Sequence, residues 1–378
     1  MTHEEFYAAA NLTGNPFRTN PAADADPRQG IWVGYPNERE LLTKFLERSL
    51  AEKVGNVNFV LIYGDYGVGK SHALLWSQYQ ILHAKKDEFK SLAYYIKTMM
   101  KDKAKMSFAI AFEEDIVNKS NIISDIMHFN QFVNECIVDF KRENGLGPEV
   151  SSEKVAEQLV PSMEMLNLLR QILNSKDEAS VRELLSPNGD HAAMLLFCRL
   201  TNLFVYPFVL QTGKRRFKQA VYLFMDEMDE LAQCSAKEAR EVNTLIRQIY
   251  DQCPNCFFLG LGFTATSAEI GVLFADYVLS RVSKQIVLEY LQPDEAKVFI
   301  KEILNYARVD HKKKINYFPF TEDAITAAVS QIVSITPRKI VNMMQQIIEE
   351  CRIAGLDPKV RPISAEDLDK NAVWEMVS

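Results

Sequence analysis

Short apolar runs recur along the chain, separated by longer segments in which apolar residues repeat every three to four positions. A continuous apolar run bounded by glycine is typical of a buried parallel strand, and the longer repeat is typical of a helix. Because the two patterns alternate, they predict an α/β fold with a parallel sheet. The five predicted strands are 58–63, 92–97, 220–225, 257–263 and 285–288.

Two regions carry mainly helical patterns. Residues of about 105–215 have helical periodicity with few strand signals, and breaks near Gly145 and Gly189 divide them, so we expect a helical insertion there. After Pro293 only helices are predicted, at about 294–308, 321–333, 337–354 and 364–374. The sequence thus predicts an N-terminal arm (1–36) with a short helix near its start, a core (37–292) and a small all-helical lid domain (293–378).

Composition narrows the class of protein. The chain has 378 residues, 47% hydrophobic and 25% charged, which is ordinary for a globular protein and excludes disordered and fibrous classes. No apolar run approaches the roughly 20 residues that span a bilayer, and no apolar signal core follows Met1, so we expect a cytoplasmic protein. A net charge of −7 argues against wholesale coating of nucleic acid but leaves room for a local basic strip.

A glycine-rich loop, Gly64-x-x-x-x-Gly69-Lys70-Ser71, follows the first predicted strand and opens a helix. In this context backbone N–H groups close around phosphate oxygens, and the helix N-terminus adds partial positive charge. Lys70 is expected to reach the β- and γ-phosphates, and the Ser71 hydroxyl to ligate Mg²⁺. The predicted cradle consists of Gly64, Asp65, Tyr66, Gly67, Val68, Gly69, Lys70, Ser71 and His72.

Two acids follow the third predicted strand. Asp226 is expected to hold Mg²⁺, directly or through water. Glu227 is expected to orient and deprotonate the attacking water. The pair therefore favours hydrolysis of the nucleotide over binding alone.

The order of these motifs resembles the AAA+ superfamily. The segment Leu223–Leu231 (LFMDEMDEL) resembles the acidic block of origin-recognition and initiator ATPases, a group that includes transposon target-selection ATPases. The segments 15–17 (NPF) and 33–41 (VGYPNEREL) resemble its N-terminal adenine-side box. The resemblance implies an AAA+ fold with ATP and Mg²⁺ as cofactors, and an adenine pocket to which Phe17 and Val33 contribute.

Three further positions are assigned through this resemblance. Thr264, or alternatively Thr266, falls where sensor 1 lies, Arg281 where the arginine finger lies, and Arg338 where the sensor 2 arginine of the lid lies. An arginine finger acts on a neighbouring subunit, so Arg281 implies a homo-oligomer, a ring or a filament. The plainer alternatives are a surface cation for Arg281 and a local cap or ion pair for Arg338.

The sequence departs from the family pattern in two places. About 120 residues separate the second and third predicted strands, more than the family places there, which is the basis of the predicted insertion. No segment after the lid helices resembles the winged-helix domain of the initiators, and we expect that domain to be missing.

Several weaker signals stay open at this stage. The pair Cys253 and Cys256 is interpreted as a plain loop rather than a zinc or redox site. The segment 197–209 is interpreted as core rather than a partner-docking helix. Three basic clusters are either solvated faces or a strip that follows duplex DNA phosphates: Lys101/Lys103/Lys105, Lys214/Arg215/Arg216/Lys218 and Lys312/Lys313/Lys314.

The sequence leaves competing functions. The preferred one is an ATP-dependent oligomeric switch on DNA, of the transposition target-selection or initiator/loader type. The alternative is a protein-directed ATPase of a phage-defence or signalling system, in which the insertion docks a protein client and DNA is not bound directly. A metabolic kinase is disfavoured by the acidic pair and the lid arginine.

Overall fold

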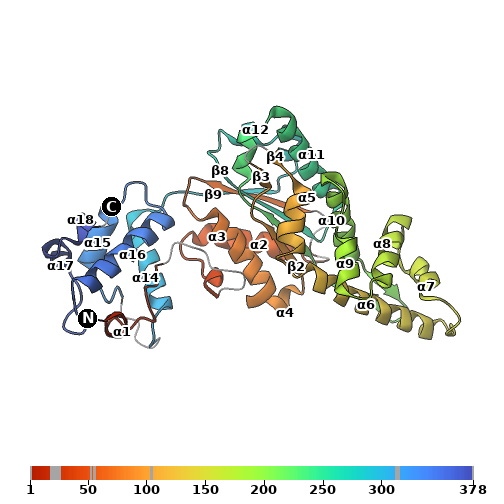
Figure 1. The fold of residues 1–378 in the computed structure, drawn as a ribbon, viewed down its shortest axis with the longest axis horizontal. Coiled ribbons are helices and arrows are strands. Elements are labelled where there is room, and N and C mark those ends of the chain that lie inside the picture. The colour runs from red at the N-terminus through yellow and green to blue at the C-terminus, as the bar shows by residue number, and fades with distance from the viewer. Residues whose placement is uncertain are drawn as a thin grey trace. The chain divides into compact units, whose positions relative to one another are not determined.

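The computed structural model describes residues 2–17, 27–51, 53, 57–102, 105–310 and 316–376 (Figure 1). The chain divides into two compact units. The lid unit comprises Met1–Arg39, Gly64–Ala73 and Val287–Ser378, and the sheet unit comprises Glu40–Tyr63 and Leu74–Ile286. The three-part division predicted from the sequence stays a prediction.

A five-stranded sheet forms the centre of the sheet unit, in the order β2-β7-β8-β1-β9. Each predicted strand is present within one residue at either end, and the α/β class with a parallel sheet is confirmed. The order places β8 between β7 and β1, so the carboxyl ends of these strands share one edge. The strands are β1 Asn58–Gly64, β2 Leu92–Ile96, β7 Val221–Met225, β8 Phe257–Thr264 and β9 Lys284–Leu288.

Burial explains why these runs are apolar throughout. Both β1 and β7 are buried along their whole length, because helices cover the sheet. The ring of Phe197 from α10 contacts Tyr94 of β2 and Phe257 of β8. The helices and turns that flank these strands are α2 Pro36–Arg48, α3 Lys70–Tyr79, η2 Gln80–Ala84, α4 Lys86–Phe89, η4 Met228–Gln233, α11 Ala236–Gln252, α12 Ile270–Leu273 and α13 Asp276–Leu279.

The predicted insertion is helical, and two of its breaks lie where the sequence predicted them. Further breaks, between α7 and α8 and between α8 and α9, were not predicted. Gly145 and Gly189 adopt positive φ angles of 63° and 87°, at the end of α6 and the start of α10. The core interpretation of 197–209 is also confirmed, since Phe197 and Phe204 are buried. The helices are α5 Phe108–Ala111, η3 Phe112–Val117, α6 Ile122–Glu143, α7 Ser152–Leu159, α8 Met163–Asn174, α9 Glu178–Leu184 and α10 Asp190–Val205.

Two short hairpins in this region were not predicted. Strands β3 Met100–Asp102 and β4 Lys105–Met106 pair antiparallel, as do β5 Phe208–Leu210 and β6 Gly213–Arg215. Strands of two or three residues show no alternation of apolar and polar positions, so periodicity does not reveal them.

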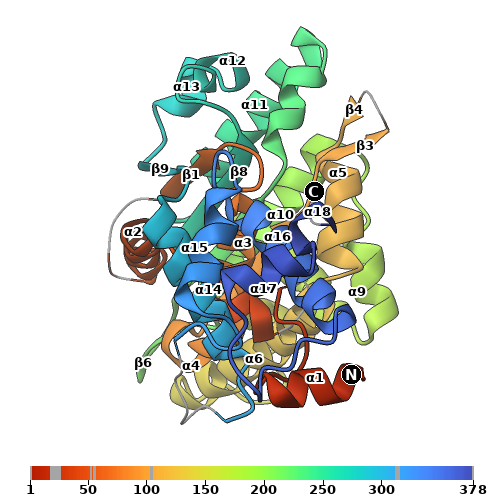
Figure 2. The ribbon, with the colours of Figure 1, turned by 90° about the vertical axis from the view of Figure 1, so that its left-hand side faces the viewer.

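The lid unit is helical, and its C-terminal part agrees with the predicted helices except that the last one divides in two (Figure 2). The N-terminal arm packs on α16, where Tyr7 donates a hydrogen bond to Glu349 and Asn15 Nδ2 donates to the Gln345 carbonyl at 3.1 Å. No helix within the described ranges is both long and apolar enough to cross a membrane. The elements are α1 His3–Ala9, η1 Pro27–Gly30, α14 Pro293–Tyr306, α15 Glu322–Ser330, α16 Pro337–Ile353, α17 Ala365–Lys370 and α18 Val373–Met376.

Candidate functional site

The phosphate loop of the lid unit has the backbone that its glycines allow. Strand β1 ends at Gly64 and α3 begins at Lys70. A Cβ atom at Gly64 would lie 2.1 Å from the carbonyl oxygen of Leu288, so only glycine fits beside β9. Gly67 has φ 82°, a left-handed conformation that a side chain would strain. The backbone conformation of the loop therefore requires glycine at positions 64 and 67.

The Lys70 ammonium lies under this loop. Its Nζ donates hydrogen bonds to the carbonyl oxygens of Gly64 at 3.2 Å and Asp65 at 2.8 Å, and the side chain is 8% exposed. Ser71 is exposed in the first turn of α3, while Val68 is buried beneath the loop. The ammonium and the N-terminus of α3 together make this part of the lid unit electropositive.

Two lid residues contact the phosphate loop. The backbone N–H of Arg338 donates to the Gly67 carbonyl at 3.2 Å, and its guanidinium lies 4.4 Å from the centre of the Tyr66 ring. Tyr290 donates a hydrogen bond to the Asp65 carboxylate, which together with the Tyr66 N–H holds the pKa of Asp65 below its usual value. Within the described part of the chain no carboxylate pairs with Arg338, so the ion-pair alternative for this residue finds no partner.

The other predicted lid-unit residues are more enclosed. Phe17 is fully buried and Val33 nearly so. His72 contacts the carbonyl oxygen of Ile31 through Nε2 at 2.6 Å, and burial lowers the pKa of its imidazole. A neutral His72 that donates to this carbonyl ties α3 to the arm.

In the sheet unit, Asp226 follows β7 and is 3% exposed. Its Oδ2 accepts a hydrogen bond from the Tyr95 hydroxyl at 2.8 Å, and its Oδ1 accepts from the Glu227 N–H at 2.9 Å. A Cβ atom at Gly262 of β8 would lie 2.7 Å from Oδ1. Over the described ranges no Lys or Arg forms an ion pair with Asp226, so a buried carboxylate is left without a protein cation.

Glu227 has an unusual backbone. It adopts φ 54° and ψ 35°, the left-handed region, which is uncommon for a residue with a side chain and persists only where the surrounding structure holds it. Burial, then the charges of Glu230 and Asp226, raise the pKa of the Glu227 carboxyl. A raised pKa makes this carboxylate a stronger base than an exposed glutamate.

The two sensor 1 candidates differ in their contacts. The Thr264 N–H, at the end of β8, donates to Asp229 Oδ1 at 3.0 Å. The hydroxyl of Thr266 donates instead to Glu269 at 2.9 Å. The Thr264 hydroxyl makes no hydrogen bond to any described residue, so it is the less engaged of the two hydroxyls.

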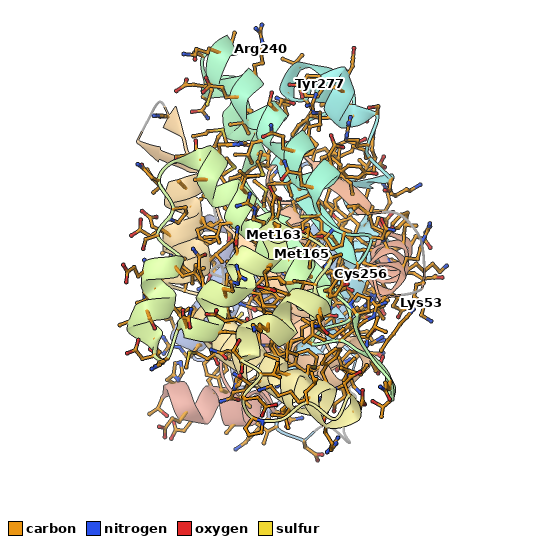
Figure 3. The ribbon with its side chains drawn as sticks, turned by 90° about the vertical axis from the view of Figure 1, so that its right-hand side faces the viewer. Lys53, Met163, Met165, Arg240, Cys256 and Tyr277 are labelled. Carbon is orange, nitrogen blue, oxygen red and sulfur yellow. The ribbon has the colours of Figure 1, made fainter. Side chains whose placement is uncertain are left out.

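Arg281 is held within its own unit. Its Nε and Nη2 donate to the two carboxylate oxygens of Asp251 at 2.7 and 3.0 Å, and its guanidinium lies 5.9 Å from the centre of the Tyr250 ring. Hydrogen bonding to Asp251 raises the pKa of Arg281. The backbone carbonyl of Tyr277 in α13 also accepts a hydrogen bond from Arg281. Figure 3 shows Tyr277 at the same end of the sheet unit as Arg240.

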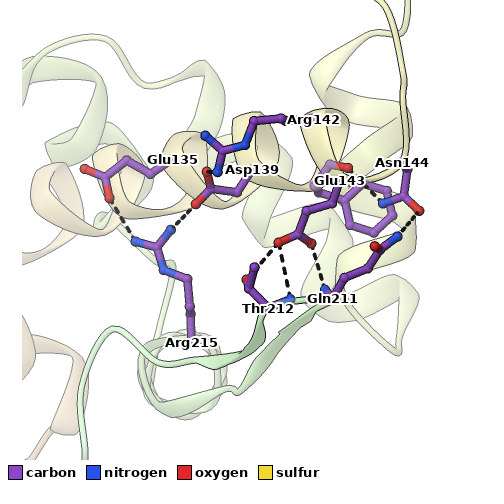
Figure 4. A network of polar contacts seen from close by, with 9 residues as sticks. Glu135, Asp139, Arg142, Glu143, Asn144, Gln211, Thr212 and Arg215 are labelled. Carbon is purple, nitrogen blue, oxygen red and sulfur yellow. Dashed lines mark hydrogen bonds and ion pairs between the residues drawn. The ribbon is translucent and has the colours of Figure 1, made fainter.

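The basic cluster after α10 is largely engaged by the insertion itself (Figure 4). Arg215 pairs with Glu135 at 3.0 Å and Asp139 at 2.6 Å, and burial lowers the pKa of the Lys218 ammonium. Glu143 accepts from the backbone N–H of Gln211 at 2.7 Å and so fixes the β5–β6 hairpin to α6. Lys103 and Lys312, Lys313 and Lys314 of the other clusters lie outside the described residues.

Cys253 caps the C-terminus of α11 and Cys256 directly precedes β8, so the pair lies in a loop, as interpreted. Cys253 is buried with its sulfur 3.6 Å from that of Cys198, and none of the described cysteines forms a disulfide. The described residues contain no group of three or more His, Cys, Asp or Glu side chains that is arranged to hold a metal.

Sequence reasoning missed four residues that contact the predicted site: Tyr95, Asp251, Gly262 and Tyr290. Each is at least 30 residues away in sequence from the residue it contacts, and no motif marks it. Only the positions of Tyr95 and Gly262 at the ends of predicted strands offered a signal.

By sequence, no protein-family model and no curated protein matches the chain. By structure, it is similar to the Aeropyrum pernix ORC1 protein in complex with DNA (12% identity, TM-score 0.47, covering 93% of this chain and 68% of that one). It is similar to the A. pernix ORC2 protein in its ADP form (12%, 0.46, 93% and 73%). It is also similar to domain III of the Thermotoga maritima replication initiation protein DnaA (10%, 0.43, 93% and 98%).

Proposed function

We propose that this chain is an AAA+ ATPase that binds ATP with Mg²⁺ and hydrolyses it. The observation that carries the proposal is the phosphate loop. It follows a buried strand, it has no space for a side chain at Gly64, and it ends at the buried Lys70, the first residue of a helix. This arrangement binds phosphate through backbone N–H groups, the helix terminus and the ammonium. Phe17 and Val33 of the arm are proposed to border the adenine.

The residues fit a magnesium ion. Asp226 offers a buried carboxylate with which no described Lys or Arg forms an ion pair, and Ser71 offers an exposed hydroxyl in the first turn of α3. Hard oxygen ligands of this kind suit Mg²⁺, which would neutralise phosphate charge. Glu227 would take the proton of the attacking water, a role that its raised pKa favours.

The remaining assignments concern assembly. We propose that Arg338 senses the nucleotide from the lid, that Thr264 rather than Thr266 serves as sensor 1, and that Arg281 completes the site of a neighbouring copy. Since Arg281 is paired with Asp251 in the isolated chain, the last role requires that pair to open on assembly. The homo-oligomer would form in the cytoplasm.

For the client, the proposal is a switch on duplex DNA of the target-selection or loader type. The second candidate is a protein-directed ATPase, and the pairing of Arg215 with Glu135 and Asp139 favours it, because those charges are no longer open to phosphates. On this alternative the insertion binds the client, and α8 presents an exposed Met163 (Figure 3).

The test of hydrolysis is phosphate release from ATP with and without Mg²⁺. Lys70→Ala is expected to abolish nucleotide binding, with Lys85→Ala as the matched lysine control. Glu227→Gln is expected to keep binding and to lower hydrolysis by roughly 10²-fold or more. Full activity of Glu227→Gln, or no nucleotide binding by the wild type, would refute the proposal.

The test of the client is a binding assay with duplex DNA at low salt, with and without a non-hydrolysable ATP analogue. A nucleotide-dependent, salt-sensitive shift supports the DNA switch. No binding under any of these conditions rejects it in favour of the protein-directed ATPase.

A further inference from the structure

Tyr95 lies where it can control the proposed magnesium ligand. It belongs to β2, the strand that pairs in parallel with β7, and Ile96 is in register with Met225. The Asp226 N–H continues this ladder by donating to the Ile96 carbonyl at 2.9 Å. The backbone of Asp226 is therefore fixed to β2, and the Tyr95 hydroxyl reaches its side chain from the same strand.

The hydrogen bonds around Asp226 leave room for a cation. A carboxylate offers about four lone-pair sites, of which Tyr95 and the Glu227 N–H each take one. The side chain is 3% exposed, and Gly262 of β8 closes the other side. The carboxylate plane is thus set by neighbours on both adjacent strands.

The Tyr95 hydroxyl can act only as a donor here. An ionised carboxylate has only acceptor sites, so the phenol supplies the proton of this 2.8 Å hydrogen bond. A phenol that donates to a carboxylate stabilises the ionised form, which is the form that ligates a metal.

We propose that Tyr95 is a positioning residue that orients the Asp226 carboxylate for Mg²⁺, and this inference rests on the proposed ATPase function. Partners of this kind fix the orientation of a metal ligand, and their removal typically weakens metal affinity by about 10- to 100-fold. The effect of Tyr95 is therefore expected in the metal dependence of nucleotide binding, before any chemical step.

The chain offers a matched control on the same strand. Tyr94 is also buried, and its hydroxyl donates to the Asp125 carboxylate at 3.1 Å. Tyr94→Phe and Tyr95→Phe thus each delete one phenol hydroxyl from adjacent residues. The first removes the phenol donor of Asp125 and the second removes that of Asp226. Only the second carboxylate is the proposed metal ligand.

The experiment measures the affinity of the full chain for a fluorescent ATP analogue in EDTA and across a Mg²⁺ titration, and the binding of Mn²⁺ by electron paramagnetic resonance. Tyr95→Phe should bind the analogue in EDTA within twofold of wild type but require about 10-fold more Mg²⁺. Tyr94→Phe should match the wild type in both measurements.

Asp226→Asn separates the possible failures. If Asp226→Asn loses the Mg²⁺ dependence and Tyr95→Phe retains that of the wild type, Tyr95 has no positioning role while the proposed function stands. If Tyr94→Phe shifts the Mg²⁺ requirement as much as Tyr95→Phe, the effect is general and the inference also fails. If the wild type shows no Mg²⁺-linked binding, the proposed function and the inference fall together.

Discussion

Replacement of Gly262 by alanine probes how closely β8 approaches Asp226. The added Cβ would lie 2.7 Å from Asp226 Oδ1 and 2.8 Å from Leu74 Cδ1. Since carbon contacts are most favourable at about 3.5 Å, the carboxylate oxygen has to move by roughly 0.8 Å. Where the shift is directed away from the Glu227 N–H, it stretches the 2.9 Å hydrogen bond to about 3.7 Å, beyond bonding distance.

The expected effects follow from these contacts. Crowding a packed core costs about 1–3 kcal/mol, and the lost freedom of a glycine in the unfolded chain offsets about 0.5–1 kcal/mol. We expect a net loss near 1 kcal/mol, seen as a drop of roughly 0.3–1 M in the urea midpoint. A hydrogen bond to a charged group is worth about 1.5–3 kcal/mol, so the Mg²⁺ requirement should rise about 10-fold or more.

The control is Gly260→Ala on the same face of β8. There the added Cβ would lie 2.9 Å from Phe224 Cδ1 and 3.0 Å from Phe258 Cε1, so it crowds aromatic rings and spares the carboxylate. Both variants should lose stability to a similar extent, and only Gly262→Ala should change the Mg²⁺ requirement. Wild-type stability and Mg²⁺ dependence in Gly262→Ala would refute the argument from close approach.

Three further predictions concern other contacts. Asp251→Asn removes the bidentate partner of Arg281, and because an exposed pair is worth about 0.2–1 kcal/mol, ATP hydrolysis at assembling concentrations should rise about two- to fivefold. Burial raises the pKa of Asp125 to about 6, so the free energy of unfolding of the wild type should fall relative to Asp125→Asn as the pH rises from about 4 through 6. Tyr66→Leu removes the ring under Arg338 and should lower the melting temperature of the nucleotide-free protein by about 1–4 °C, whereas Tyr66→Phe should not.

Each of these has an outcome that contradicts it. An unchanged rate in Asp251→Asn, with Arg281→Ala as active as the wild type, would remove the finger role. If the urea midpoints of the wild type and Asp125→Asn differ by the same amount at pH 4.5 and at pH 7.5, the pKa of the Asp125 carboxyl is not raised. Equal melting temperatures of the Leu and Phe variants would show that the ring contact with Arg338 contributes nothing.

The sheet was predictable because strands that are buried on both faces need apolar residues at every position, as in β1 and β7. The phosphate loop was predictable because its chemistry is contiguous, from Gly64 to Ser71. The β5–β6 hairpin was not, since its stability comes from Glu143, which is distant in sequence.

The contacts that shape the acidic site escaped prediction for a related reason. Tyr95 and Asp226 are 131 residues apart and meet only because β2 pairs with β7. Asp251 and Arg281 are 30 residues apart in sequence, with β8 between them, and their side chains form an ion pair. Periodicity locates strands but does not give their order, so it could not place these partners.

The parallel pairing of β2 with β7 has a consequence for the insertion between them. The chain leaves β2 at one edge of the sheet and must enter β7 at the opposite edge, a return of about 17 Å for five residues. Helix α10, with 16 residues, spans about 24 Å and contacts β7, so it is the return path. Helices α6 to α9 are then a side lobe that this crossover does not require. A chain that joins Val117 directly to Asp190 retains the crossover. The lobe meets the sheet through α10 and η3, which contact β7 and β2, and through α6, whose Asp125 accepts a hydrogen bond from Tyr94 of β2. A client bound to the lobe therefore reaches the acidic site through these three segments.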